Sequence, residues 1–375
     1  MWLDSGLKTW VCLLLERIKI VIEKWGECYY MAEFSARQPL TMSQIAAAAG
    51  VSIPTVSKVI NQRADVAPAT RERVQRVMEE YGYVLNRAGR SLRKGHNGQI
   101  DFVVLGLHSY YVFEILRGVE DALLSTEFRV VLASTHDHQH HERQWRQRLT
   151  DGSTDGAVVV LADNQSTHLQ ELRRRHIPFV VVDRLGQLDP DDLSVSATNL
   201  AGGKAATEYL LSLGHRRIAA LMGPPHFPCN QDRLSGYRIA LQEAGIASDP
   251  ALIRYGDFHV EQAYHEMKHL LDLPEPPTAV FAGNDEQSLG VYRALQERGL
   301  PIPEAMSVVG FDNMAYTAWI TPALTTVQQP LLEMGRVATK MLLRLIAGEP
   351  IDTLRVELAT PLIKRASCAP PGSVR

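Results

Sequence analysis

From Ile100 onward, short apolar runs alternate with segments whose apolar residues recur every three or four positions. The runs have the length of buried strands, and the segments between them have the period of amphipathic helices. This alternation is typical of βαβ units, which build parallel sheets with helices on both faces. The predicted strands lie at 101–107, 129–134, 156–162, 178–183, 217–223, 278–284 and 307–312, and the predicted helices at 112–125, 168–176, 201–214, 233–245, 263–273 and 287–299.

The stretch before residue 100 has a different pattern, typical of three short helices. Small apolar residues end at Gly50, and Ser52 with Pro54 then opens a second helix, which is the chemistry of a tight helix-turn-helix. In such a unit the second helix enters the DNA major groove. A charged helix over 70–83 follows, with one apolar stripe. The stripe is formed by Val74, Val77, Met78 and Tyr81.

These patterns predict a small all-α helix-turn-helix headpiece followed by an α/β two-lobed sensor with two doubly wound parallel sheets. Ligands of open α/β sheets bind beyond the carboxyl ends of the strands, so we expect the ligand in the cleft between the lobes. The expected boundaries are an N-terminal extension 1–38, a headpiece 39–85, a linker or marginal helix 86–97, a two-lobed α/β domain 98–369, and a tail 370–375. Within that domain we expect an N-lobe of about 98–198 and 330–357, and a C-lobe of about 199–329 and 358–369.

Charge is distributed unevenly along the 375 residues. The segment 41–95 holds nine bases and four acids, a net of +5, and the whole chain carries −3, which leaves −8 for the rest. A basic end joined to an acidic remainder indicates a nucleic-acid-binding segment next to a domain of another kind. A basic face that is merely solvated remains the alternative.

The first 38 residues predict neither a membrane span nor a signal peptide. Glu16, Arg17 and Lys19 interrupt their apolar run. Met31 is an alternative start, since the organised pattern begins near Leu40.

Neither a cofactor nor a metal is expected. The four cysteines are scattered, which favours a reducing cytoplasm over a disulfide framework. The histidines of 136–143 lack zinc-site spacing and predict an exposed polar loop.

Several segments in a fixed order carry a family resemblance. They are TMSQIAAAAGVSIPTVSKVIN, NRAGRSLRKG, ILRGVEDAL, LGHRRIAALMGPP, RLSGYRIALQEAG, PTAVFAGNDEQSLGVYRAL, SVVGFDN and TPALTTVQQPLLEMG. Together they resemble the LacI/GalR family of bacterial transcription regulators, from about Leu40 to Ala369. The resemblance implies a homodimer that binds palindromic double-stranded operator DNA, and a small effector, usually a sugar, that alters operator affinity through the hinge. It makes 86–97 the hinge helix and 98–369 the effector-binding and dimerisation domain.

The resemblance also implies which residues bind DNA. Ile53 and Pro54 match the positions where the family varies operator choice, and neither side chain can hydrogen-bond to a base, so we expect apolar and shape-based readout there. Ser43 stands where the family commonly has tyrosine. Gly89 stands where it usually has alanine, and because glycine destabilises a helix interior, this departure predicts a hinge helix that folds only on DNA. The full predicted set is Thr41, Ser52, Ile53, Pro54, Thr55, Ser57, Lys58, Asn61, Thr70, Tyr83, Asn86, Arg87 and the minor-groove wedge Leu92.

Residue-by-residue transfer likewise gives an effector site in the cleft. Carboxylates and amides pair with sugar hydroxyls, arginine donates hydrogen bonds, and an aromatic ring stacks on the apolar face of a sugar. Leu331 stands where some relatives have an aromatic residue. We therefore expect Trp319 to stack on the sugar in its place. The predicted residues are Asp183, Arg233, Phe258, Asn284 and Asp312, with Trp319, His108, Tyr111, His136 and Asp137 at the lips of the cleft.

Structural roles remain as alternatives for several of these residues. Ile53 and Phe258 could be core residues, Asp183 and Asp312 could cap helices or make turns, and Arg233 could form a structural ion pair. For the whole chain, a periplasmic-type sugar-binding protein or an α/β enzyme without a DNA role is the alternative. The former lacks a signal segment, and the latter lacks GxSxG, P-loop and strand-linked GxGxxG motifs.

The residues do not determine which effector binds, or whether it strengthens or weakens operator binding. The effector acts as an inducer or as a co-repressor depending on which arrangement of the two lobes orders the hinge. The tract from RYGDF to VELAT resembles that of actinobacterial family members often linked to pentose or plant-oligosaccharide use, and this resemblance implies xylose or a xylo-oligosaccharide as the effector. The predicted function is therefore a ligand-responsive repressor of a carbohydrate-use operon.

Overall fold

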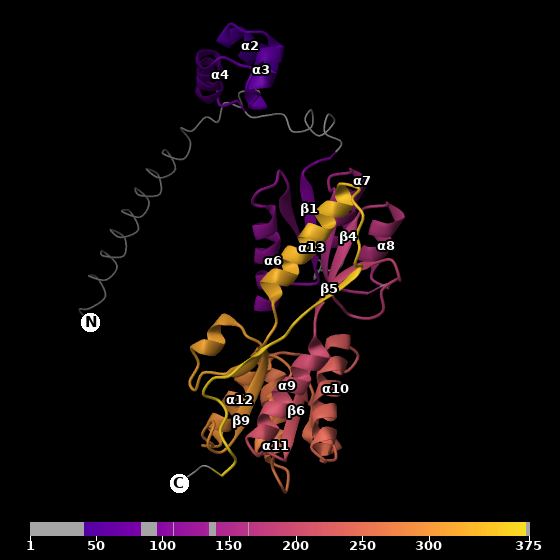
Figure 1. Ribbon diagram of the computed structural model, residues 1–375, viewed down its shortest axis with the longest axis vertical. Coiled ribbons are helices and arrows are strands. Elements are labelled where there is room, and N and C mark those ends of the chain that lie inside the picture. The colour runs from indigo at the N-terminus through magenta and orange to yellow at the C-terminus, as the bar shows by residue number, and fades with distance from the viewer. Residues whose placement is uncertain (1–40, 84–95, 108, 135–139, 164, 373–375) are drawn as a thin grey trace, which may run out of the picture. The chain divides into compact units, whose positions relative to one another are not determined.

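The computed structural model describes residues 41–83, 96–107, 109–134, 140–163 and 165–372. The chain divides into two compact units, 1–87 and 88–375, which are described separately. The fold of each is drawn as a ribbon in Figure 1.

Within residues 41–83, the described part of the first unit, there are three helices, α2 (Met42–Ala49), α3 (Ile53–Ile60) and α4 (Pro68–Glu80). Thr41 and Gln44 form a reciprocal capping box at the start of α2, and Gly50 ends that helix with φ +62°. Ser52 caps α3, as the sequence predicts. The helices enclose a small core of Ile45, Ala46, Ala49, Val56, Val59, Val66 and Val74.

The predicted apolar stripe of the third helix is wrong at its last position. Helix α4 ends at Glu80, so Tyr81 lies beyond it and is half-exposed. Gly82, with φ +58°, then reverses the chain and brings Tyr83 against the core together with Val77 and Met78.

The N-lobe is a parallel sheet in the order β11-β5-β4-β3-β1-β2. In its register, Phe102 lies opposite both Leu132 and Val158. Its elements are β1 (Gln99–Val104), α6 (Tyr110–Leu123), β2 (Arg129–Ser134), α7 (His140–Thr150), β3 (Gly156–Ala162), α8 (Thr167–Arg174), β4 (Phe179–Arg184), β5 (Leu193–Ala197), α13 (Leu331–Ile346) and β11 (Arg355–Leu358).

The C-lobe is a second sheet in the order β12-β10-β9-β8-β6-β7, parallel except for β12. Its first helix begins at Asn199, where the second β/α series is predicted. Its elements are α9 (Asn199–Ser212), β6 (Ile218–Met222), α10 (Pro228–Glu243), η1 (Pro250–Leu252), β7 (Ile253–Tyr255), α11 (Val260–Leu271), β8 (Ala279–Ala282), α12 (Asp285–Glu297), β9 (Ser307–Asp312), η2 (Ala315–Ala318), β10 (Thr325–Gln328) and β12 (Leu362–Ile363).

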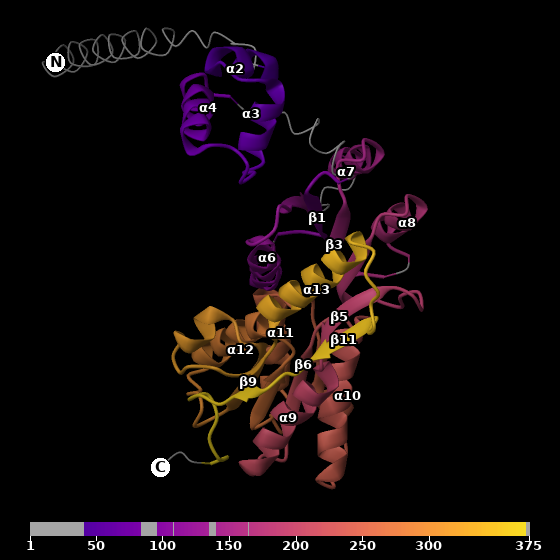
Figure 2. The ribbon, with the colours of Figure 1, turned by 45° about the horizontal axis from the view of Figure 1, so that its top comes forward.

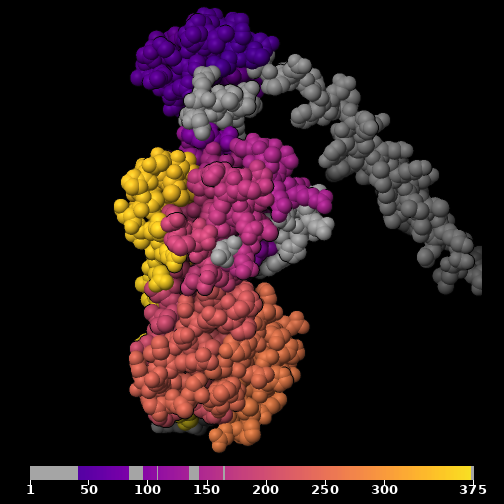
Figure 3. All heavy atoms as spheres, turned by 90° about the vertical axis from the view of Figure 1, so that its right-hand side faces the viewer, coloured from indigo at the N-terminus to yellow at the C-terminus, as the bar shows by residue number. Residues whose placement is uncertain are grey.

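The chain passes between the lobes three times, after β5, β10 and β11. Helix α13 therefore lies far along the sequence yet packs beside α6 of the N-lobe, as Figure 2 shows. At Gly118 a Cβ would stand 1.9 Å from the carbonyl oxygen of Leu332, so only glycine permits this approach. In Figure 3 the late residues of the chain, in yellow, cover one side of this lobe.

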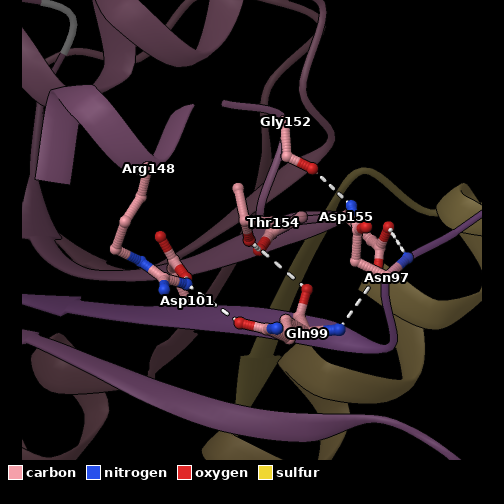
Figure 4. A network of polar contacts seen from close by, with 8 residues as sticks. Asn97, Gln99, Asp101, Arg148, Gly152, Thr154 and Asp155 are labelled. Atoms are coloured by element: carbon pink, nitrogen blue, oxygen red, sulfur yellow. Dashed lines mark hydrogen bonds and ion pairs between the residues drawn. The ribbon is translucent and has the colours of Figure 1, made fainter. Parts of the chain in front are cut away.

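A polar network fixes the start of β1 (Figure 4). Asp155 accepts hydrogen bonds from the backbone of Gln99 (2.9 Å) and of Asn97 (2.7 Å). The fully buried Asp101 accepts from Arg148 of α7 at 2.8 Å. Burial raises the pKa of Asp101, and the arginine opposes that shift. These contacts tie α7 and the turn before β3 to the first strand.

The predicted fold class, a helix-turn-helix headpiece with a two-lobed α/β sensor, is confirmed. Among the described residues, no helix has the length and apolar character needed to cross a membrane.

Candidate functional site

Every described residue of the predicted DNA-binding set is exposed or half-buried. Ile53 exposes 46% of its surface at the start of α3, so it is no core residue. Ser52, Pro54, Lys58 and Asn61 are also exposed, and Thr55, Ser57, Thr70 and Tyr83 are half-buried. Asn86, Arg87 and Leu92 lie outside the described residues.

Several polar side chains of α3 already have partners. The hydroxyls of Ser52 and Thr55 lie 2.9 Å apart. Asn61 donates to the carbonyl of Ser57 at 2.8 Å. Lys58 pairs with Asp65 at 2.7 Å, and this hydrogen bond lowers the pKa of Asp65. The surface of α3 therefore combines an apolar start with a paired cation.

In the second unit, a cavity of about 320 Å³ is lined by residues of both lobes. This volume is at the small end of the range for ligand sites, about 300–1,000 Å³. Six of the predicted effector residues line it, Tyr111, Asp183, Arg233, Phe258, Asn284 and Asp312.

Backbone strain is concentrated at this cavity. Four of its lining residues have positive φ: Leu161 (+56°), Asp183 (+49°), Phe258 (+73°) and Asp312 (+117°). Such conformations cost about 1–3 kcal/mol each and persist where surrounding structure enforces them, typically at functional sites. Two of these residues, the aspartates, lie at the carboxyl ends of β4 and β9, where doubly wound sheets present side chains to ligands.

On the N-lobe side, the Tyr111 hydroxyl donates a hydrogen bond to Asp183 Oδ2. Burial raises the pKa of Asp183, which the tyrosine and Arg233 oppose. Burial and the neighbouring carboxylate raise the pKa of Tyr111 well above its usual value. The phenol is therefore a neutral donor and Asp183 an acceptor that points to the cavity rather than to a helix cap.

On the C-lobe side, Arg233 is buried at the cavity, and its charge opposes the rise that burial causes in the pKa of both Asp183 and Asp312. Its Nε donates to Asn199 Oδ1 (2.9 Å) and its Nη1 to the carbonyl of Gly283 (2.6 Å). Its guanidinium carbon lies 3.8 Å from the ring centroid of Phe311. The guanidinium is thus held rigidly at the cavity wall.

Asn284 joins the aromatic part of the site to α12. Its Oδ1 caps the helix by accepting from Gln287 N (2.8 Å), and its Nδ2 donates to the carbonyl of Phe258 (3.1 Å). A Cβ at Gly223 would stand 2.1 Å from the Phe258 ring, so the ring lies directly on that glycine. The ring is half-buried, with a face available to the cavity, which does not fit a core residue.

Asp312 accepts a hydrogen bond from Gln329 Nε2 at 2.6 Å. Burial raises the pKa of Asp312 to about 6, while Arg233 acts in the opposite direction. Gln329 Oε1 is buried and has no hydrogen-bond partner among the described residues. An unpaired buried acceptor in a cavity is suited to a ligand hydroxyl.

Sequence reasoning missed several lining residues. Gln329 follows β10, and Glu286 lies in the first turn of α12 beside His259, 3.0 Å from its Nδ1. Phe227 and Cys229 lie at the start of α10. Burial raises the pKa of the Cys229 thiol to about 11. All of these residues follow a strand or lie at the start of a helix, and that position could have been used to predict them.

Trp319 is 86% exposed after η2 and is not among the residues that line the cavity, so its place at the lip of the cleft stays a prediction. Leu331 is buried in the N-lobe core. His108, His136 and Asp137 lie outside the described residues. No cluster suited to a metal ion occurs in the described part of the chain.

Two sequence profiles match this chain. One describes bacterial regulatory proteins of the lacI family, over residues 41–86, and the other a periplasmic binding protein-like domain, over 207–368. The HTH-type transcriptional regulator CelR of Thermobifida fusca is 37% identical over 338 residues, covering 88% of this chain and 98% of that protein. The chain belongs to the LacI family of bacterial transcription regulators.

Other LacI-family relatives agree over a similar span. The HTH-type transcriptional repressor PurR of Edwardsiella ictaluri is 33% identical, covering 88% of this chain and 97% of that protein. A solved CelR–cellobiose complex superposes with a TM-score of 0.68 at 34% identity, covering 88% and 99% of the two chains. The lac repressor dimer bound to operator and the anti-inducer ONPF gives 0.76 at 26% identity, covering 88% and 100%.

The LacI family consists of regulators and not enzymes, so this protein is a DNA-binding transcription regulator. Neither alternative from the sequence is favoured, because the relatives align across headpiece and sensor together.

Proposed function

We propose that this regulator is a repressor of a carbohydrate-use operon, and that a sugar bound in the cavity between the lobes alters its affinity for operator DNA. The observation that carries this proposal is the cavity lining. Buried acceptors on Asp183, Asp312 and Gln329, a buried donor on Arg233 and the ring of Phe258 match the hydroxyls and apolar face of a sugar. The relative solved with cellobiose supports a saccharide.

The same proposal includes a homodimer on a palindromic operator, with segment 86–97 as the hinge between headpiece and sensor. The lac repressor, solved as a dimer on operator, supports this assembly. Exposed aromatic residues on α6, Tyr110 and Phe113, supply apolar surface of the kind that subunit interfaces bury. The family's action on chromosomal DNA implies a cytoplasmic protein, and we propose that it is associated with the nucleoid.

The test uses the full chain and a panel of uncharged sugars that includes xylose, xylobiose, cellobiose and ribose. We expect one of them to raise the melting temperature and to change the affinity for an operator selected from random DNA. A nucleoside and an amino acid are the comparison ligands. If only these shift the melting temperature, the sugar proposal is wrong. If no ligand changes DNA binding, the regulatory link is wrong.

Light scattering during gel filtration tests the assembly. A dimer mass is expected, and a monomer at micromolar concentration would contradict it.

A further inference from the structure

The recognition helix α3 carries one cation, and that cation is neutralised within the headpiece. Lys58 is the only base of α3, and its Nζ lies 2.7 Å from Asp65 Oδ2. The two side chains expose 51% and 58% of their surfaces, so the pair lies at the surface of the headpiece. The hydrogen bond from Lys58 lowers the pKa of Asp65, which shows that the lysine stabilises the charged carboxylate.

The fold places Asp65 by fixing the chain before it. Helix α3 ends in a Schellman motif, with Gln62 at φ +53°. Gln62 N donates to Val59 O at 3.0 Å, and Arg63 N donates to Lys58 O at 3.0 Å. The backbone that leads to Asp65 therefore folds back over the same turn of α3 that carries Lys58.

The chain on either side of the pair is also anchored. Arg71 of α4 donates to the carbonyl of Arg63, and Val66 is buried in the headpiece core. Asp65 thus lies on a short segment held at both ends. The backbone fold therefore places its carboxylate beside Lys58.

Such a pair changes how the headpiece reads DNA. Cations that neutralise phosphates release counterions and supply binding that is independent of sequence. A carboxylate beside the cation repels phosphates and offsets that contribution, whereas a lysine Nζ can still donate to guanine in the major groove. We propose that Asp65 is a specificity-determining residue, because it pairs with Lys58 and withdraws one positive charge from phosphate binding.

The inference rests on the headpiece binding DNA, and a double-mutant cycle on the full-length protein tests it. The variants are Asp65→Asn, Lys58→Gln and the two combined. The readout is fluorescence anisotropy with a random-sequence duplex and with an operator selected by the wild type, each across a salt series.

For Asp65→Asn we expect affinity for random DNA to rise about 3–10-fold, with a salt slope steeper by about 0.9. Operator affinity should rise less, so that the ratio of operator to random affinity falls. In the Lys58→Gln background, Asp65→Asn should change random-DNA affinity by less than about twofold, because the charge that Asp65 withdraws is gone.

Glu79→Gln is the matched control, since it removes one exposed headpiece carboxylate that has no ion pair among the described residues. An equal gain from Glu79→Gln, or an equal gain from Asp65→Asn with and without Lys58, would show general repulsion and overturn the inference. An unchanged specificity ratio in Asp65→Asn would also overturn it. Absence of DNA binding by the wild type would instead contradict the proposed function.

Circular dichroism keeps the comparison valid, since an exposed ion pair contributes little to folding and all variants should retain the wild-type melting transition.

Discussion

Gln329 donates a 2.6 Å hydrogen bond to Asp312 from Nε2 while its own Oε1, buried at the cavity, lacks a partner among the described residues. The amide thus orients a carboxylate and offers an acceptor of its own. Both groups face the space where we place the effector.

Gln329→Met should weaken effector binding about 10-fold or more, because it removes an acceptor for a ligand hydroxyl and the donor that orients Asp312. The loss of such hydrogen bonds costs about 1–3 kcal/mol. Isothermal titration calorimetry with the sugar identified in the panel measures it. Gln328→Met, the same change one residue earlier and outside the cavity lining, is the control. Equal affinities for Gln329→Met and the wild type would remove Gln329 from the site.

Effector binding should weaken as the pH falls below about 6. Burial raises the pKa of Asp312 to about 6. This acceptor is therefore protonated in a pH range in which binding to the protein can be measured. Sugar hydroxyls that donate to the carboxylate favour its ionised form, so binding releases a proton and lower pH opposes it. The association constant should fall about tenfold per pH unit below the pKa and level off above pH ~7. In Asp312→Asn, binding should be weaker and the pH dependence lost. A sloping profile in that variant would assign the titration to another group.

His215 should make the C-lobe sensitive to acid by a separate route. Its ring nitrogens lie 2.9 Å from Thr278 Oγ1, Ser307 Oγ and the carbonyl of Ala369. Burial lowers its pKa, so the unfolded chain binds a proton that the folded chain does not. The free energy of unfolding that depends on neutral His215 is therefore present above pH ~6.5 and lost as the pH falls below it.

Urea denaturation of the wild type and His215→Gln at several pH values tests this. The wild type should lose stability more steeply with acid than the variant, although the variant is less stable at pH ~7.5 because its hydrogen bonds are lost. Parallel pH profiles would show that His215 does not titrate on unfolding.

Ile53→Ala should change operator choice. Ile53 is exposed at the start of α3, and its side chain can only make apolar contacts, such as one with a thymine methyl. Selection from random DNA should show relaxed preference at one symmetric pair of positions, at about 1–3 kcal/mol per position. The wild type selected in parallel is the reference, and an unchanged base preference would exclude a reading role for Ile53.

The residues of the candidate effector site came from the family resemblance, and the positions of some of them relative to strands and helices agree with it. Asp183 and Asp312 follow apolar runs, and Asn284 precedes a helix, so their place at the carboxyl edge of a sheet follows from local pattern. Trp319 could not be placed in this way, since it belongs to the irregular segment after η2, whose path depends on packing. The short strands β5, β7, β10, β11 and β12 have no long apolar run, and periodicity alone did not find them.

By itself the sequence determined the helix-turn-helix and the alternating α/β order, because caps, turns and apolar periods are local properties. The family resemblance supplied about half of the polar residues at the cavity and the expectation that 330–357 returns to the N-lobe. Tertiary structure alone decided that Gln329 reaches Asp312 and that Asp65 meets Lys58. These two pairs depend on how the backbone folds back at the ends of strands and helices. Such distances are set by packing between elements, which no local pattern of residues records.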